Sequence, residues 1–148
     1  MDDPRAKLND ALKEAMKSKE NERRDVIRMA LSAVKQIEID TQKEVDSAGV
    51  IDVLQKEAKK RRESIDEMAK AGREESAAQE KRELDILEEF LPTQLTSDEI
   101  AAIVNEIIVQ VGATSAKDMN KVMGPLMQRV KGLADGKLVN QIAREILK

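Results

Sequence analysis

Residues 91–99 read Leu91-Pro92-Thr93-Gln94-Leu95-Thr96-Ser97-Asp98-Glu99, and this stretch divides the 148-residue chain. Pro92 ends a helix because its ring removes a backbone N–H donor and clashes with the preceding turn. Thr96 and Glu99 have the spacing of a capping box, which starts the next helix. The stretch therefore predicts a hinge, with an N-terminal helical domain over residues 1–92 and a C-terminal domain over residues 93–148.

On the C-terminal side of this hinge, apolar residues recur at helical spacing in three segments. The first ends at Gly112, the second follows a Ser115 cap and ends at Gly132, and the third follows an Asp135 cap. The sequence therefore predicts a three-helix unit. Its apolar positions are Ile100, Val104, Ile107, Ile108, Val111, Met119, Val122, Met123, Leu126, Met127, Val130, Leu138, Val139, Ile142 and Ile146.

The N-terminal side carries four helical segments of the same kind, so that we expect a four-helix unit there. Asp3-Pro4 is typical of an N-cap followed by the first helical residue. The polar residues 40–49 predict a loop between the second and third helices. The expected later segments run from an Asn21 cap to about Ile39, from Val50 to Ala71 with Gly72 as a C-terminal cap, and from Glu75 to Phe90.

Composition supports an all-α fold and excludes several kinds of chemistry. Helix formers are abundant, and Phe90 is the only aromatic residue. The chain has no His and no Cys, which removes the commonest general base, thiolate nucleophiles and zinc cages. We therefore expect no catalytic residues, no cofactor and no metal.

The start of the chain and its hydropathy bear on location. Met1-Asp2-Asp3-Pro4 is acidic where a secretory signal is basic, and no apolar region follows it. Apolar runs are too short to span a bilayer. These features predict a cytoplasmic protein without a membrane partner.

Three charged or methionine-rich clusters have structural interpretations that we favour over functional ones. The basic run 59–62 points around a helix and has acids four residues away, which favours a salt-bridged, solvated helix. The acids Asp85, Glu88 and Glu89 are typical of a solvated helix end. Methionines spaced by four residues favour a core face over a pliable binding groove. The expected ion pairs are Asp52–Lys56, Glu57–Arg61, Lys59–Glu63 and Arg62–Asp66.

The segment Val130-Lys131-Gly132-Leu133-Ala134-Asp135-Gly136-Lys137 is the strongest candidate for a binding site. Two glycines bracket a helix-to-helix turn, which lets the backbone approach a partner closely. Lysines flank the turn, and the start of the last helix suits a phosphate. Plain turn chemistry explains the same residues equally well. The candidate RNA-binding residues near this turn are Lys121, Arg129, Lys131, Gly132, Gly136, Lys137 and Arg144.

Charge is distributed unevenly between the two halves. Residues 96–148 contain seven Lys/Arg and six Asp/Glu, for a net charge of +1, whereas residues 1–95 have a net charge of −4. Without aromatic stacking platforms in the C-terminal half, RNA contacts would depend on phosphates and shape, with strong salt dependence.

Short stretches along nearly the whole chain resemble the GatB/YqeY family, specifically its small stand-alone YqeY-like proteins. Their order and spacing carry the resemblance. The stretches are 24–29 (RDVIRM), 60–65 (KRRESI), 71–73 (AGR), 90–95 (FLPTQL), 112–115 (GATS), 117–119 (KDM), 121–123 (KVM) and 134–140 (ADGKLVN).

The resemblance implies that the three-helix unit is like the tail of the B subunit of tRNA-dependent amidotransferases, which contributes to holding tRNA. A related tail is attached to some glutaminyl-tRNA synthetases, so amidotransferase or synthetase subunits are implied partners. Asn140, in the last matching stretch, joins the RNA-binding candidates. Two departures stand out. Family members commonly carry Arg where this chain has Leu133, and the usual Phe and Tyr of the first half appear as Met68 and Phe90.

Three functions compete at this point. We favour a non-catalytic module that binds tRNA or a tRNA enzyme. A carbon–nitrogen ligase or amidase activity, using glutamine as amido donor, is the alternative that family inheritance suggests. Against it, the serines lie on helices, at caps or in the polar loop, with no base partner in sight. A protein–protein adaptor using the acidic first unit and its long third helix is compatible with RNA binding.

Overall fold

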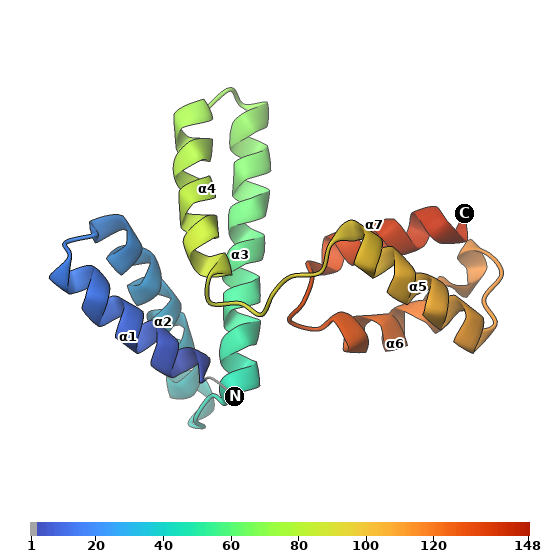
Figure 1. The fold of residues 1–148 in the computed structure, drawn as a ribbon, viewed down its shortest axis with the longest axis horizontal. Helices are drawn as coiled ribbons and strands as arrows, with labels where there is room; N and C mark the ends of the chain where they lie inside the picture. Colours follow the sequence, from blue (N-terminus) through green and yellow to red (C-terminus); the bar gives the residue numbers. More distant parts are fainter. Residues whose placement is uncertain (1–2) are drawn as a thin grey trace. The chain divides into compact units, whose positions relative to one another are not determined.

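The computed structural model describes residues 3–148, and every regular element within them is a helix. The prediction of an all-α fold is therefore confirmed. The chain forms two compact units, residues 1–92 and residues 93–148, each with its own hydrophobic core (Figure 1). No single helix among the described residues is long and apolar enough to cross a membrane; residues 97–111 and 116–130 pass that test only as a pair bent by 86°.

The first unit contains α1 (Pro4–Lys17), α2 (Asn21–Thr41), α3 (Ser47–Lys70) and α4 (Glu74–Glu88). In Figure 1, α1 lies along α2, and α3 lies along α4. The long α3 also contacts α1 and α2. The core is aliphatic and includes Leu8, Ile27, Val34, Val50, Leu54, Ala58, Leu84 and Leu87.

Local capping determines where these helices begin. The Asp3 carboxylate accepts a hydrogen bond from Arg5 N at 3.0 Å, and Pro4 is the first helical residue, as predicted. Two expected boundaries differ from the structure. Asn21 is the first residue of α2 and not its cap, which is Glu20. The loop expected over residues 40–49 is shorter, because the Asp46 carboxylate accepts from Gly49 N at 2.8 Å and starts α3 at Ser47.

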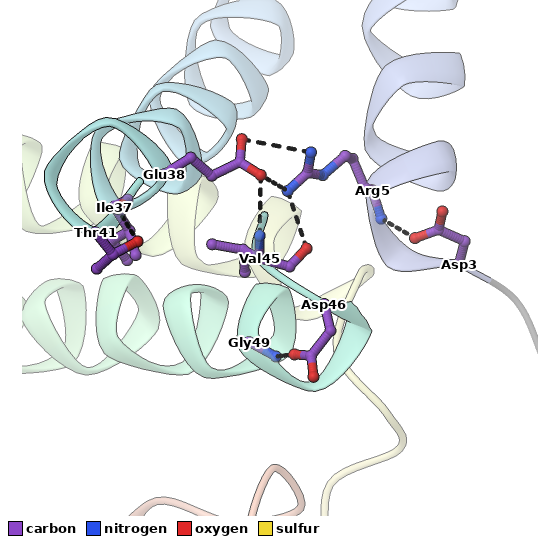
Figure 2. Close-up of polar contacts among 8 residues, drawn as sticks. All are labelled: Asp3, Arg5, Ile37, Glu38, Thr41, Val45, Asp46 and Gly49. Carbon is purple, nitrogen blue, oxygen red and sulfur yellow. Dashed lines mark hydrogen bonds and ion pairs between the residues drawn. The ribbon is translucent and has the colours of Figure 1, made fainter. Parts of the chain in front are cut away.

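A three-way contact ties α1 to the end of α2 and to the following loop (Figure 2). Arg5 Nη2 donates to Glu38 Oε2 at 2.9 Å and to the Val45 carbonyl at 3.1 Å. Glu38 also accepts from Val45 N at 2.9 Å. The hydrogen bond from Arg5 is the largest of the effects that lower the pKa of Glu38.

The basic run 59–62 is only partly solvated, which corrects our prediction. Lys60 and Arg61 pair with Glu57 as side chains of a salt-bridged helix do, but Arg61 is only 6% exposed. Arg62 pairs with Glu88 of α4 at 3.4 Å and not with Asp66. The reason is that α4 packs along α3 and supplies acids to the face that α3 turns toward it.

The second unit contains α5 (Ser97–Val111), a 3-10 turn η1 (Ala116–Asp118), α6 (Met119–Val130) and α7 (Gly136–Leu147). The capping box is present as predicted: Thr96 Oγ1 accepts from Glu99 N, and Glu99 Oε1 accepts from Thr96 N. Gly112 ends α5 with φ +69°, a conformation that glycine adopts without strain. Ser115 caps η1 and not α6. The core comprises Ile100, Val104, Ile107, Ala113, Val122, Leu126, Val130, Val139, Ala143 and Leu147.

Candidate nucleic-acid interface

The turn between α6 and α7 occupies residues 131–135. Gly132 has φ +77°, a backbone conformation that glycine adopts without steric cost, so the turn itself requires a glycine at this position. Leu133 N donates to the Val130 carbonyl at 2.8 Å, which closes the turn at the end of α6. A Cβ at Gly136 would lie 3.2 Å from the methyl carbon of Met127, the end of a flexible side chain that is 38% exposed and can move aside, so packing does not require the second glycine.

The first residues of the second unit hold this turn in place. Leu95 N donates to the Leu133 carbonyl at 2.8 Å, and Gln94 Nε2 donates to the Gly132 carbonyl at 3.1 Å. The turn that contains Lys131 is therefore anchored by two hydrogen bonds on the segment that precedes α5.

The start of α7 is capped by an acid. The Asp135 carboxylate accepts from Lys137 N at 3.3 Å, as predicted for an N-cap. This carboxylate lies where a phosphate would approach the helix end, and like charges repel. A phosphate would therefore be bound by side chains of α7 and not by the backbone N–H groups of its first turn.

Two of the predicted cations have acidic neighbours. Lys121 lies 3.7 Å from Asp118, and Arg129 Nη1 lies 3.0 Å from Glu106 of α5. The hydrogen bond from Thr114 N, at 2.8 Å, is the main cause of a lowered pKa for Asp118, which keeps that acid ionised beside Lys121. These two cations do not join the others in one cluster of free positive charge.

Lys131, Lys137 and Arg144 have no acid within ion-pair distance among residues 3–148. Lys137 and Arg144 lie on the outer face of α7, opposite the residues that this helix buries in the core. An open groove of about 430 Å³ follows this face, and its lining includes a single acid, Glu145. We use "the α7 outer face" for the basic and amide residues of this groove, which are Lys137, Asn140, Gln141, Arg144 and Lys148.

The α7 outer face unites three of the residues predicted from the sequence and adds two that were missed. Lys137, Asn140 and Arg144 are the predicted ones, and Gln141 and Lys148 are the additions. Helical spacing in the sequence could have identified these two residues, since residues 137, 141, 144 and 148 recur every three or four positions and so lie on one face of a helix. Such an arrangement presents cations and amide donors along one line, which suits a row of phosphates.

The other clusters have structural explanations. Asp85 pairs with Lys81 at 2.8 Å, Glu88 with Arg62, and Glu89 with Arg23. Met119 and Met123 pack against the core of the second unit, whereas Met127 is 38% exposed. Within residues 3–148, no group of three acidic side chains is placed to hold a metal ion.

Comparison with known proteins places this chain in a family. A family model described as "Yqey-like protein" matches residues 5–147, nearly the whole chain. The chain belongs to the YqeY-like protein family. The resemblance found in short stretches of the sequence is therefore confirmed.

This YqeY-like chain is also similar to yeast proteins named altered inheritance of mitochondria protein 41, mitochondrial. It is 36% identical to the Kluyveromyces lactis protein over 110 residues, which are 72% of this chain and 59% of that protein. It is 30% identical to the Eremothecium gossypii protein over 115 residues, which are 76% of this chain and 63% of that protein. The chain thus spans about 60% of the length of these curated relatives.

The prediction of a cytoplasmic protein is corrected by these relatives, all of which are named as mitochondrial, including one from Lachancea thermotolerans that is 36% identical over 87 residues. The prediction rested on the lack of an apolar signal region. That criterion bears only on secretion, because mitochondrial targeting uses amphipathic, arginine-rich segments without such a region.

Proposed function

We propose that this YqeY-like protein is a non-catalytic module that binds the phosphate backbone of tRNA through the α7 outer face. The observation that supports this proposal is the gathering of Lys137, Arg144 and Lys148 on one exposed helix face with a single acid, Glu145. Lys131, exposed on the adjoining turn, extends the cationic surface.

The chemistry of the face favours backbone contacts over base recognition. Lysine and arginine neutralise phosphates, and Asn140 and Gln141 donate hydrogen bonds to phosphate or ribose oxygens. The second unit has no aromatic side chain on which an unpaired base could stack. Structured RNA, whose phosphates are held in fixed positions, is therefore the ligand that fits this face best.

We also propose that the three helices of the second unit act as the tail of an amidotransferase B subunit does, holding tRNA for a tRNA enzyme. In this role the chain carries no reaction of its own, and an amidotransferase or aminoacyl-tRNA synthetase is the protein partner. Recovery of such an enzyme with the tagged chain, dependent on intact tRNA, would support this role. Glutamine hydrolysis by the purified chain alone would contradict it.

The direct test is the binding of labelled tRNA to the full chain at several salt concentrations. Mitochondrial tRNA should be included, because the relatives are named as mitochondrial proteins. The K137E/R144E double variant should bind at least about tenfold more weakly at low salt, and its salt dependence should be shallower because fewer counterions are released.

A matched control is the K121E/R129E double variant, which makes the same charge change at cations that face Asp118 and Glu106. We expect it to bind tRNA much more tightly than K137E/R144E. Equal weakening in both variants would show that only overall charge matters, and no binding of wild type at low salt would overturn the proposal.

A further inference from the structure

The α7 outer face carries two uncharged amides among its cations. Asn140 and Gln141 line the same groove as Lys137, Arg144 and Lys148. Asn140 is half-buried and Gln141 is exposed, and neither amide has a side-chain hydrogen-bond partner among the described residues. Each amide therefore keeps both its NH2 donor and its carbonyl acceptor available to a ligand in the groove.

Helical geometry places these amides between two of the cations. Along the axis of α7, at about 1.5 Å per residue, both amides lie about 5 Å beyond Lys137 and about 5 Å before Arg144. Around the axis, at about 100° per residue, the two cations lie within about 20° of each other, with Asn140 on one side of their line and Gln141 on the other. The opposite side of the helix is buried in the core, so a ligand reaches all four side chains from one direction.

This order of cation, amide and cation matches the order of groups along a nucleic acid strand, in which a sugar separates each phosphate from the next. Phosphate oxygens accept hydrogen bonds, and ammonium and guanidinium groups only donate them, so that Lys137 and Arg144 suit phosphates. The amides between them both donate and accept, and they suit a sugar group that does the same.

The ribose 2′-hydroxyl is such a group, and it is the group by which a protein distinguishes RNA from DNA. Its hydrogen needs an acceptor, which lysine and arginine do not provide. The side-chain acceptors that line this groove are the carbonyl oxygens of Asn140 and Gln141 and the carboxylate of Glu145. Neighbouring phosphates repel the carboxylate, which leaves the two amides as the acceptors that fit a backbone.

We propose that Asn140 and Gln141 make the α7 outer face selective for RNA over DNA by contacting ribose 2′-hydroxyls between the phosphates that Lys137 and Arg144 bind. This selectivity rests on the proposed function, because the same face has to bind RNA. The amide oxygens accept the hydroxyl hydrogens, and the amide NH2 groups donate to adjacent ribose or phosphate oxygens. In an A-form duplex the 2′-hydroxyls line the wide, shallow minor groove, so α7 lies along an edge of that groove.

The test measures binding of three hairpin duplexes of one sequence to the full chain at low salt. The first is RNA, the second is the same RNA with fluorine in place of every 2′-hydroxyl, and the third is DNA. The fluorinated hairpin keeps the A-form shape and lacks the hydroxyl hydrogen. Wild type should bind the RNA hairpin at least about fivefold more tightly than either of the others, because their hydrogen bonds to the amides are missing.

The N140A/Q141A variant should bind the RNA and fluorinated hairpins about equally, because it removes both amides. Since these amides are uncharged, the variant should keep the wild-type slope of log affinity against log salt, whereas K137E/R144E should make this slope shallower. This difference separates the contact with the hydroxyl from the contribution of charge.

The matched control is N105A/Q110A, which removes the same two kinds of side chain from exposed positions of α5. It should discriminate between the hairpins as wild type does, and circular dichroism checks that all variants are folded. Equal binding of the RNA and fluorinated hairpins by wild type, equal binding of RNA and DNA, or unchanged discrimination in N140A/Q141A would overturn the proposed selectivity. Binding of tRNA by wild type would then still support the proposed function, which only the absence of tRNA binding would overturn.

Discussion

Arg5 and Glu38 are 33 residues apart in the chain, yet Arg5 Nη2 lies 2.9 Å from Glu38 Oε2. The same carboxylate accepts from Val45 N at 2.9 Å, so one side chain joins the start of α1, the last turns of α2 and the loop before α3 (Figure 2). Its hydrogen-bonding partners keep this acid ionised and lower its pKa from the ordinary value of 4.5.

This lowered pKa makes a prediction about acid stability. In the unfolded chain Glu38 titrates near 4.5, and in the folded chain below it. Its stabilising effect is therefore complete above pH 4.5 and is lost as the pH falls through the folded pKa. The E38Q variant should have a lower Tm than wild type at pH 7, and this difference should shrink as the medium is made acidic. The variant E44Q, at an exposed loop position, should leave Tm nearly unchanged at both pH values.

Two glycines of the second unit should respond differently to alanine. Apart from its chain neighbours, a Cβ at Gly112 or at Gly124 would have no atom within 4 Å. Gly112 has φ +69°, and G112A should lower the free energy of unfolding by about 1 kcal/mol. Gly124 lies inside α6 directly before Pro125, whose ring crowds a Cβ on the preceding helical residue, so that the gain in helix propensity is offset and G124A should change the free energy of unfolding by less than about 0.5 kcal/mol. Urea denaturation measures both, and a gain in stability for G112A would contradict the assignment of the α5 end.

Leu133 offers a gain-of-function test of RNA binding. This residue is half-buried on the turn whose flanking Lys131 extends the basic surface. The L133R variant should bind tRNA more tightly than wild type at low salt. Its log affinity should fall more steeply with log salt, by about 0.7–0.9 per additional phosphate contact. Tighter binding without a steeper salt dependence would mean that the new arginine does not contact a phosphate.

Arg61 should be among the most sensitive charged positions of the first unit. It is buried between Glu57 and Glu83, and its loss leaves both carboxylates without this cation. Removing one partner of a buried pair costs about 3–5 kcal/mol, so R61A should lower the free energy of unfolding by about 3 kcal/mol. The neighbouring K60A variant removes an exposed side chain and should change stability by no more than about 0.5 kcal/mol. Similar effects of the two variants in urea would contradict the burial of Arg61.

The candidate RNA-binding residues could be predicted only in part. The sequence pointed to the lysines beside the glycine-bracketed turn, because glycine and charge are visible without a structure. It did not separate Lys137 from Lys121 or Arg129, whose acidic partners distinguish them. For Lys121 that partner is Asp118, three residues earlier, a spacing that is visible in the sequence. For Arg129 that partner, Glu106, lies on another helix. It also missed Lys148, whose place on the α7 outer face depends on which side of the helix the core covers.

The helical class, the capping box at Thr96 and the helix ends at Gly72 and Gly112 were determined by the sequence itself, because each depends on residues within one turn of each other. The burial of Arg61, the Arg5–Glu38 pair and the grouping of cations on α7 were decided by tertiary structure. Ion pairing and burial depend on which helix faces pack together, and residues distant in the chain supply the partners.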